Sequence, residues 1–173
     1  MMRATIAAAA LVLSAAAFDA VPVSAQQSAR STDRRAPAVV LTRLDGTELD
    51  LGRHVGETPI VLHFFAAWCS QCRQQMPSLR AAIDRYGKSV KFVGVAVSAN
   101  QSLERAKRYA AQHGMTHDVV YDARGTAVER FNVATTSYVI VVDRSGRIVF
   151  TGSGGDLDVV AAIGRALKEA VSD

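Results

Sequence analysis

Two kinds of hydrophobic pattern alternate along the chain. Continuous apolar runs at 60–65, 90–97 and 138–142 are typical of strands that are buried on both faces. Apolar residues spaced three or four positions apart at 103–111 and 157–167 predict amphipathic helices. Strands that alternate with helices predict an α/β fold, in which helices cover both faces of a central sheet.

Shorter segments complete this pattern. Asp45-Gly46 predicts the turn of an N-terminal β-hairpin, and a second hairpin across 143–146 predicts a mixed sheet. The helix that follows Cys72 contains Pro77, so we expect it to kink, to reach about Tyr86 and to end at Gly87. The other expected elements are strands at 39–44, 47–51, 118–122 and 147–151, and a short helix at 126–131. For the final helix we expect a cap at Asp156 and an apolar face of Leu157, Val160, Ala161, Ile163, Gly164 and Leu167.

The first 25 residues have the pattern of a secretory signal peptide. Arg3 supplies a positive charge, 4–18 is mostly apolar, and 23–25 has the small residues that a signal peptidase requires. The apolar run is shorter than the ~20 residues that span a bilayer, so an uncleaved membrane anchor is the weaker alternative. We therefore expect export to the periplasm, a polar disordered linker at 26–36 and one folded domain at 37–173.

Charge and composition exclude some classes of function. The formal net charge is +4 with neutral histidines, but the basic residues are scattered along the chain. Without a basic stripe or a polybasic block, the sequence indicates neither nucleic-acid binding nor binding to a membrane surface. The hydrophobic fraction of 49% is enough for one domain with a core of its own.

Cys69 and Cys72 are the only cysteines of the chain, and they lie between a predicted strand and a predicted helix. A structural zinc site needs four ligands, so this C-x-x-C pair favours a redox-active dithiol. At the start of the helix, free N–H groups and the helix dipole favour a thiolate on Cys69, which makes it the candidate nucleophile. Cys72 would resolve the mixed disulfide, and no cofactor is expected besides the Cys69–Cys72 disulfide. A purely structural disulfide would stabilise little across so short a loop.

The residues around this pair resemble a known family. Trp68-Cys69-x-x-Cys72 follows Phe-Phe-Ala-Ala, and Pro77 lies five residues beyond Cys72. This arrangement resembles the thioredoxin superfamily, and more closely its exported TlpA/ResA-type thiol–disulfide oxidoreductases. The resemblance implies a thioredoxin-like fold and an enzyme that exchanges disulfides with protein clients, most simply as a reductase. It also implies an upstream electron donor linked to the membrane, and a Trp68 that packs against the dithiol and presents it. We also expect the protein to be a monomer.

Three further positions could support the dithiol. His63, six residues before Cys69, could accept the proton of Cys72 or could be an ordinary core histidine. The family often has a glutamate where this chain has Gln75, and an amide cannot act as acid or base. The cis-proline that aligns substrates in relatives falls on Ser137 here, so we expect a trans peptide bond before Ser137.

Two other functions compete with disulfide exchange. Cys69, Cys72 and His63 could hold Cu(I) or Zn(II) in a metallochaperone, because Ser137 would no longer keep metals away. His54, His113 and His117 have no ligand spacing, so we interpret them as surface residues rather than as metal ligands. A peroxidase of the peroxiredoxin type would need Thr-x-x-Cys, which Ala66-Ala67-Trp68-Cys69 does not match.

Overall fold

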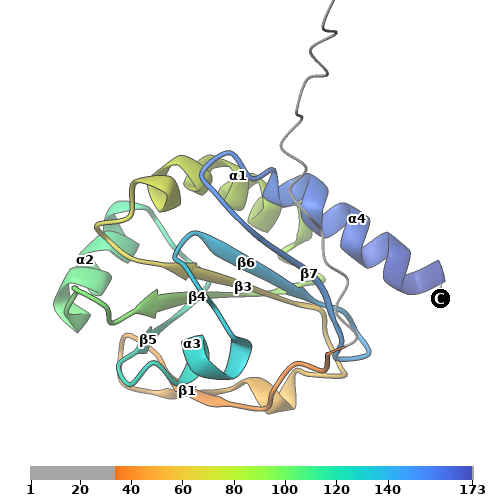
Figure 1. Cartoon of the computed structure of the whole chain (residues 1–173), viewed down its shortest axis with the longest axis horizontal. Helices are drawn as coiled ribbons and strands as arrows, with labels where there is room; N and C mark the ends of the chain where they lie inside the picture. Colours follow the sequence, from red (N-terminus) through yellow and green to blue (C-terminus); the bar gives the residue numbers. More distant parts are fainter. Residues whose placement is uncertain (1–33, 173) are drawn as a thin grey trace, which may run out of the picture.

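A computed structural model describes residues 34–172, with a central five-stranded sheet (Figure 1). The elements in chain order are β1 (Val40–Thr42), β2 (Glu48–Asp50), η1 (Leu51–Arg53, a 3₁₀ turn), β3 (Ile60–Phe65), α1 (Ser70–Tyr86), β4 (Lys91–Val97), α2 (Leu103–Gln112), β5 (Asp118–Asp122), α3 (Thr126–Phe131), β6 (Tyr138–Val142), β7 (Ile148–Ser153) and α4 (Val159–Ser172). The order of strands in the sheet is β5-β4-β3-β6-β7, and β1 pairs with β2 in a separate hairpin. Because β3 is parallel to β4 and antiparallel to β6, the sheet is mixed, as predicted.

Each face of the sheet has its own hydrophobic core. Alternate residues of the strands, among them Leu62 and Phe64, face the hairpin and α3. The other face carries Val61, packed with α1 and α4, and Phe65, packed with α2 and the cysteines. Figure 1 shows α1 and α4 side by side on one side of the sheet and α3 with the hairpin on the other. The predicted α/β architecture with helices on both faces is confirmed.

The central strand β3 delivers the chain to the dithiol. All six of its residues are buried, which explains its continuous apolar sequence. His63 is the one polar residue of this strand. It shares a face with Val61 and Phe65, because side chains alternate along a strand. His63 therefore lies on the face that α1 covers, while Cys69 follows the end of the strand.

Three details of the predicted elements are wrong. The final helix begins at Val159 rather than near Asp156, because the Asp158 carboxylate caps it and accepts from the N–H of Ala161 at 2.9 Å. Its buried face is Val159, Ala162, Ile163 and Ala166, whereas Val160 and Ala161 lie at the edge of that face. The glycine-rich segment after Thr151 also continues β7 as far as Ser153.

The described part begins within the predicted linker. Ala36 is buried and donates to the carbonyl of Gly146, and Arg35 forms a bridge with Arg147. Residues 34–36 thus extend the folded domain rather than the linker. The predicted signal peptide and the first part of the linker lie outside the described residues. Within 34–172, none of the helices has the length and apolar character needed to cross a bilayer.

Candidate functional site

The dithiol lies at the junction of β3 and α1. Cys69 and Cys72 form a disulfide with Cα atoms 5.3 Å apart. Cys69 is the N-cap residue of α1, and its Sγ accepts a hydrogen bond of 3.0 Å from the backbone N–H of Cys72. Cys69 is 5% exposed and Cys72 is fully buried. The sulfur that is more accessible is therefore also the one that the helix N-terminus stabilises as an anion.

Trp68 stands on the surface next to the dithiol. It is 42% exposed, so it is not a core residue. The indole N–H donates to the carbonyl of Ala99 at 2.8 Å, which ties Trp68 to the loop after β4. An exposed, fixed aromatic ring beside a reactive sulfur offers apolar contact area to a protein substrate.

Gln101 is a site residue that the sequence did not reveal. Its Oε1 accepts from the N–H of Ala67 at 2.9 Å, and its Nε2 donates to the carbonyl of Val97. Its own carbonyl accepts from the hydroxyl of Tyr121 at 2.8 Å. Gln101 therefore joins the segment before the dithiol to the ends of two neighbouring strands. The loops after parallel strands meet at one edge of a sheet, which is the signal that could have found it.

Ser137 is fully buried and connects to the residues between the cysteines. Its hydroxyl accepts from the N–H of Gly154 at 3.3 Å and donates to Oε1 of Gln71 at 3.2 Å. No peptide bond within 34–172 is cis, which confirms the expected trans bond before Ser137. Ser137 has φ of 55°, a left-handed conformation that costs a serine ~1 kcal/mol. Its hydrogen bonds offset this cost.

Ser137→Ala is expected to lower the free energy of unfolding of the oxidised protein by about 1–2 kcal/mol, because the N–H of Gly154 loses a partly buried acceptor. Gln71→Ala removes only an exposed partner of the same hydroxyl, so its effect should be smaller. Urea unfolding monitored by Trp68 fluorescence measures both values. Equal stabilities for wild type and Ser137→Ala would show that the hydroxyl contributes nothing.

The side chains of Gln75 on α1 and His63 on β3 are both polar and buried. Nε2 of Gln75 donates to the carbonyls of Gly154 at 2.8 Å and Ser137 at 3.3 Å. His63 is 1% exposed, and burial, together with the charge of His117, lowers its pKa to about 3 although Gln75 opposes the shift. Among the described residues, neither ring nitrogen of His63 nor Oε1 of Gln75 has a hydrogen-bond partner. His63 is thus a neutral, buried imidazole on the face that α1 covers.

His117 is not the surface residue that the sequence suggested. It is partly buried, its Nδ1 is buried without a hydrogen-bond partner, and burial lowers its pKa to about 4. Gly94, which pairs with His63 across β3 and β4, makes this position possible. A Cβ at Gly94 would lie 3.3 Å from Nε2 of His117, so any larger residue there would crowd the ring.

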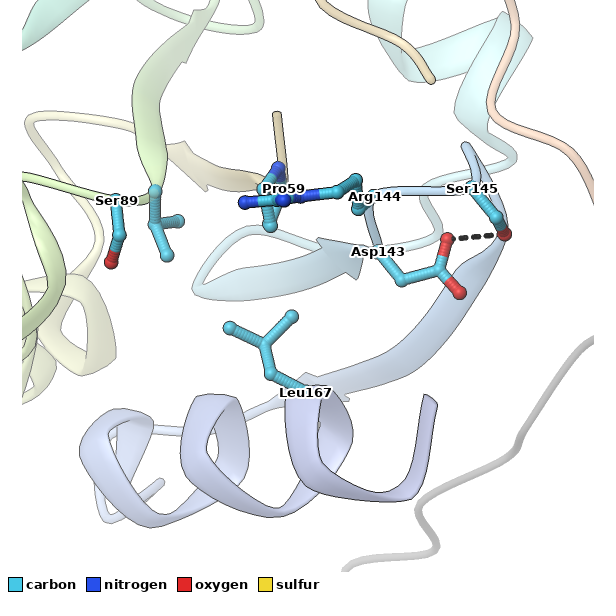
Figure 2. Close-up of a pocket in the computed structure, with 7 residues that line it drawn as sticks. Pro59, Ser89, Asp143, Arg144, Ser145 and Leu167 are labelled. Atoms are coloured by element: carbon cyan, nitrogen blue, oxygen red, sulfur yellow. Dashed lines mark hydrogen bonds between the residues drawn. The ribbon is translucent and has the colours of Figure 1, made fainter. Parts of the chain in front are cut away.

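A large recess of the described surface lies away from the dithiol. It has a volume of about 680 Å³ and lies among Pro59, Ser89, Val90, Leu167 and the 143–145 turn. Figure 2 shows Leu167 of α4 facing that turn, where the hydroxyl of Ser145 donates to Asp143. Pro59 precedes β3 and Cys69 follows it, so the recess and the dithiol lie at opposite ends of the sheet.

The residues proposed for a metal site do not form one. Within 34–172, no group of three or more His, Cys, Asp or Glu side chains is arranged to hold a metal ion. Cys69 and Cys72 are joined to each other instead. The arrangement of the described donors therefore does not favour the metallochaperone hypothesis.

The comparisons with known proteins agree with this geometry. The family model described as Redoxin matches residues 31–167. The chain belongs to the Redoxin family. It is 26% identical over 130 residues to the thiol-disulfide oxidoreductase ResA of Geobacillus kaustophilus, which covers 74% of each chain. It is 25% identical over 121 residues to the sporulation thiol-disulfide oxidoreductase A of Bacillus subtilis, with 68% of this chain and 72% of that protein covered.

Solved structures of similar proteins share the fold. A thiol:disulfide interchange protein of the thioredoxin family from Chlorobium tepidum superposes with a TM-score of 0.66 at 23% identity, over 80% of this chain and 99% of that one. A secreted disulfide oxidoreductase from Mycobacterium tuberculosis gives a TM-score of 0.65 at 22% identity, over 74% and 96%. Likenesses at these identities establish the thioredoxin-like fold. Together with the ResA match and the Cys69–Cys72 disulfide, they confirm the predicted class, a thiol–disulfide oxidoreductase.

Proposed function

We propose that this Redoxin family member is an exported reductase of protein disulfides, with the Cys69–Cys72 pair as its only redox group. The observation that carries the proposal is the position of Cys69 as the N-cap of α1, with Cys72 buried one turn inside. The hydrogen bond to Cys69 Sγ comes from a backbone amide and not from a cationic side chain. The reductive direction is taken from the resemblance to TlpA/ResA-type oxidoreductases, and the insulin experiment below tests it.

The reaction follows from the accessibility of the two sulfurs. The Cys69 thiolate attacks one sulfur of a client disulfide, a mixed disulfide forms, and the client's other sulfur leaves as a thiolate that takes up a proton. Cys72 then loses its proton and attacks Cys69 Sγ, which releases the second client thiol. The client gains two electrons, and the enzyme ends as the Cys69–Cys72 disulfide seen here.

His63 is the group proposed to accept the proton of Cys72. It occupies the β3 face opposite the first turns of α1, between Val61, which packs with Met76, and Phe65, which packs with Cys72. Phe65 stacks on the His63 ring at a centroid distance of 5.6 Å. A neutral imidazole can take a proton, whereas the Gln75 amide cannot. Gln75 instead anchors α1 to the loops at Ser137 and Gly154.

Client and compartment belong to the same proposal. The signal-peptide pattern of residues 1–25 and the secreted relative from Mycobacterium tuberculosis support export to an oxidising compartment. There a reductase needs electrons from elsewhere, so we expect a membrane-linked donor. We also propose that the protein works as a monomer and docks clients beside Trp68 and Ser137.

Insulin, whose disulfides are accessible, tests the direction of electron flow. The protein reduced with dithiothreitol and then desalted is expected to reduce insulin in a single turnover. The oxidised protein is expected to oxidise a reduced, unfolded protein much more slowly. The opposite order of the two rates would make the protein a disulfide donor.

A further inference from the structure

His63 and His117 lie together under the sheet face that α1 covers. His63 pairs in register with Gly94, and the ring of His117, together with Met115 and Phe65, occupies the space that a side chain at Gly94 would fill. Burial, and to a smaller extent the neighbouring His117, lower the pKa of His63. The dithiol chemistry described above uses only His63, and it does not explain how a proton reaches a residue that is 1% exposed.

His117 has access to solvent that His63 lacks. It lines a recess of about 170 Å³ with Arg80 and Asp84 of α1 and with His113, which follows α2. It also lines a neighbouring recess of about 400 Å³ together with Lys91. His117 therefore reaches the space beside Gly94 and also lines two recesses of the described surface.

The charged groups around His117 favour a proton on it rather than on His63. Asp118, the next residue, raises the pKa of His117 and is itself paired with Arg43 and Lys91. The recess adds one carboxylate, Asp84, and one guanidinium, Arg80, on its outer side. His63 faces only His117 and the neutral Gln75 among titratable or polar neighbours that affect its pKa. Asp118 therefore makes His117 the more favourable of the two rings for a proton.

We propose that His117 is the relay through which protons pass between His63 and solvent during disulfide exchange. The inference rests on the proposed role of His63 as the base for Cys72. In the resolving step the Cys72 thiol gives its proton to His63, and the Cys72 thiolate attacks Cys69 Sγ. His63 passes that proton to His117, which releases it to water in the recess and returns to the neutral form. When an external donor reduces the disulfide, the proton follows the same path inward. His117 is thus a positioning and relay residue that acts through His63.

The test uses the full protein, reduced, with dithiobis(nitrobenzoate) as the disulfide substrate. The first release of the yellow nitrobenzoate thiolate reports attack by Cys69, and the second reports resolution by Cys72. His117→Gln is expected to leave the first phase unchanged and to slow the second on the order of ten-fold near neutral pH. Added imidazole should restore the second phase, because it can enter the recess and carry the proton. His113→Gln, which changes another histidine of the same recess, is the matched control and should behave as wild type.

Gly94→Ala provides an independent variant that keeps both histidines. Its Cβ would meet Cε of Met115 at 3.0 Å and both Nε2 of His117 and Cε1 of Phe65 at 3.3 Å, so it would crowd the ring of His117, and the second phase should slow in the same way. The relay is contradicted if His117→Gln resolves at the wild-type rate across the pH range, or if its slower phase does not respond to imidazole. If His63→Gln releases the second thiolate at the wild-type rate, His63 is not the base for Cys72, and the relay that depends on it is contradicted. By contrast, a wild type that never releases the second thiolate would overturn the proposed function itself.

Discussion

Cys72→Ser is expected to abolish turnover and to trap client proteins on Cys69 as mixed disulfides. The chain has no third cysteine, so nothing can replace Cys72 in the attack on Cys69 Sγ. Turnover of insulin reduction should fall by at least about 10³-fold, because the remaining resolution depends on external thiols. Non-reducing gels followed by mass spectrometry would detect the trapped species.

Cys69→Ser is the matched control for this trap. It should lose turnover to the same extent but should trap no client, since Cys72 is fully buried and cannot reach a protein disulfide. Equal trapping by the two variants would contradict the assignment of Cys69 as the nucleophile. Trapping by Cys69→Ser alone would reverse the roles of the two cysteines.

The free energy of unfolding of the oxidised protein is expected to fall by about 3–4 kcal/mol between pH 7 and pH 5. In the folded protein, burial lowers the pKa of His63 to about 3 and that of His117 to about 4. In the unfolded chain both titrate near 6.5, so between pH 6.5 and 4 the unfolded state binds more protons than the folded state. Stability is therefore fully present above pH 6.5 and is lost as the pH falls.

Urea unfolding at a series of pH values measures this effect. His117→Gln should reduce the pH dependence to about half, because one of the two buried titrating groups is gone. Since a single domain has roughly 5–15 kcal/mol of stability, the effect at pH 5 is a large share of the total. A wild-type stability that does not change between pH 7 and 5 would contradict the burial of both histidines as neutral rings.

The sequence predicted most of the fold because the strongest signals are local. The buried strand β3, the dithiol at its end and the helix that ends before Gly87 all follow from contiguous residues. The error at Asp156 arose because Asp156 and Asp158 are equally good cap residues in sequence. The choice of Asp158 depends on α1, where the hydroxyl of Ser78 accepts from the N–H of Val159 at 2.8 Å.

The parts of the site that the sequence did not predict depend on distant segments that meet in space. Gln101 reaches Ala67 across 34 residues, and Gly154 reaches Ser137 only because β6 and β7 pair as a hairpin. The sequence around His117 predicted a surface histidine, because it does not reveal that the ring lies against Gly94 on β4. The spacing of these residues in the sequence does not predict that they meet, whereas the pairing of the strands in the sheet brings them together.

The redox equilibrium of the Cys69–Cys72 pair tests the central claim most directly. The purified protein would be equilibrated with glutathione buffers of graded potential, and the free thiols of Cys69 and Cys72 would be alkylated and counted by mass spectrometry. The proposed function predicts a reversible two-electron couple near that of thioredoxin, at about −270 mV, with both thiols appearing together. A couple near −120 mV, the value of a strong oxidant, would contradict the reductase assignment. Failure to form a reversible Cys69–Cys72 disulfide at any potential would contradict disulfide exchange itself.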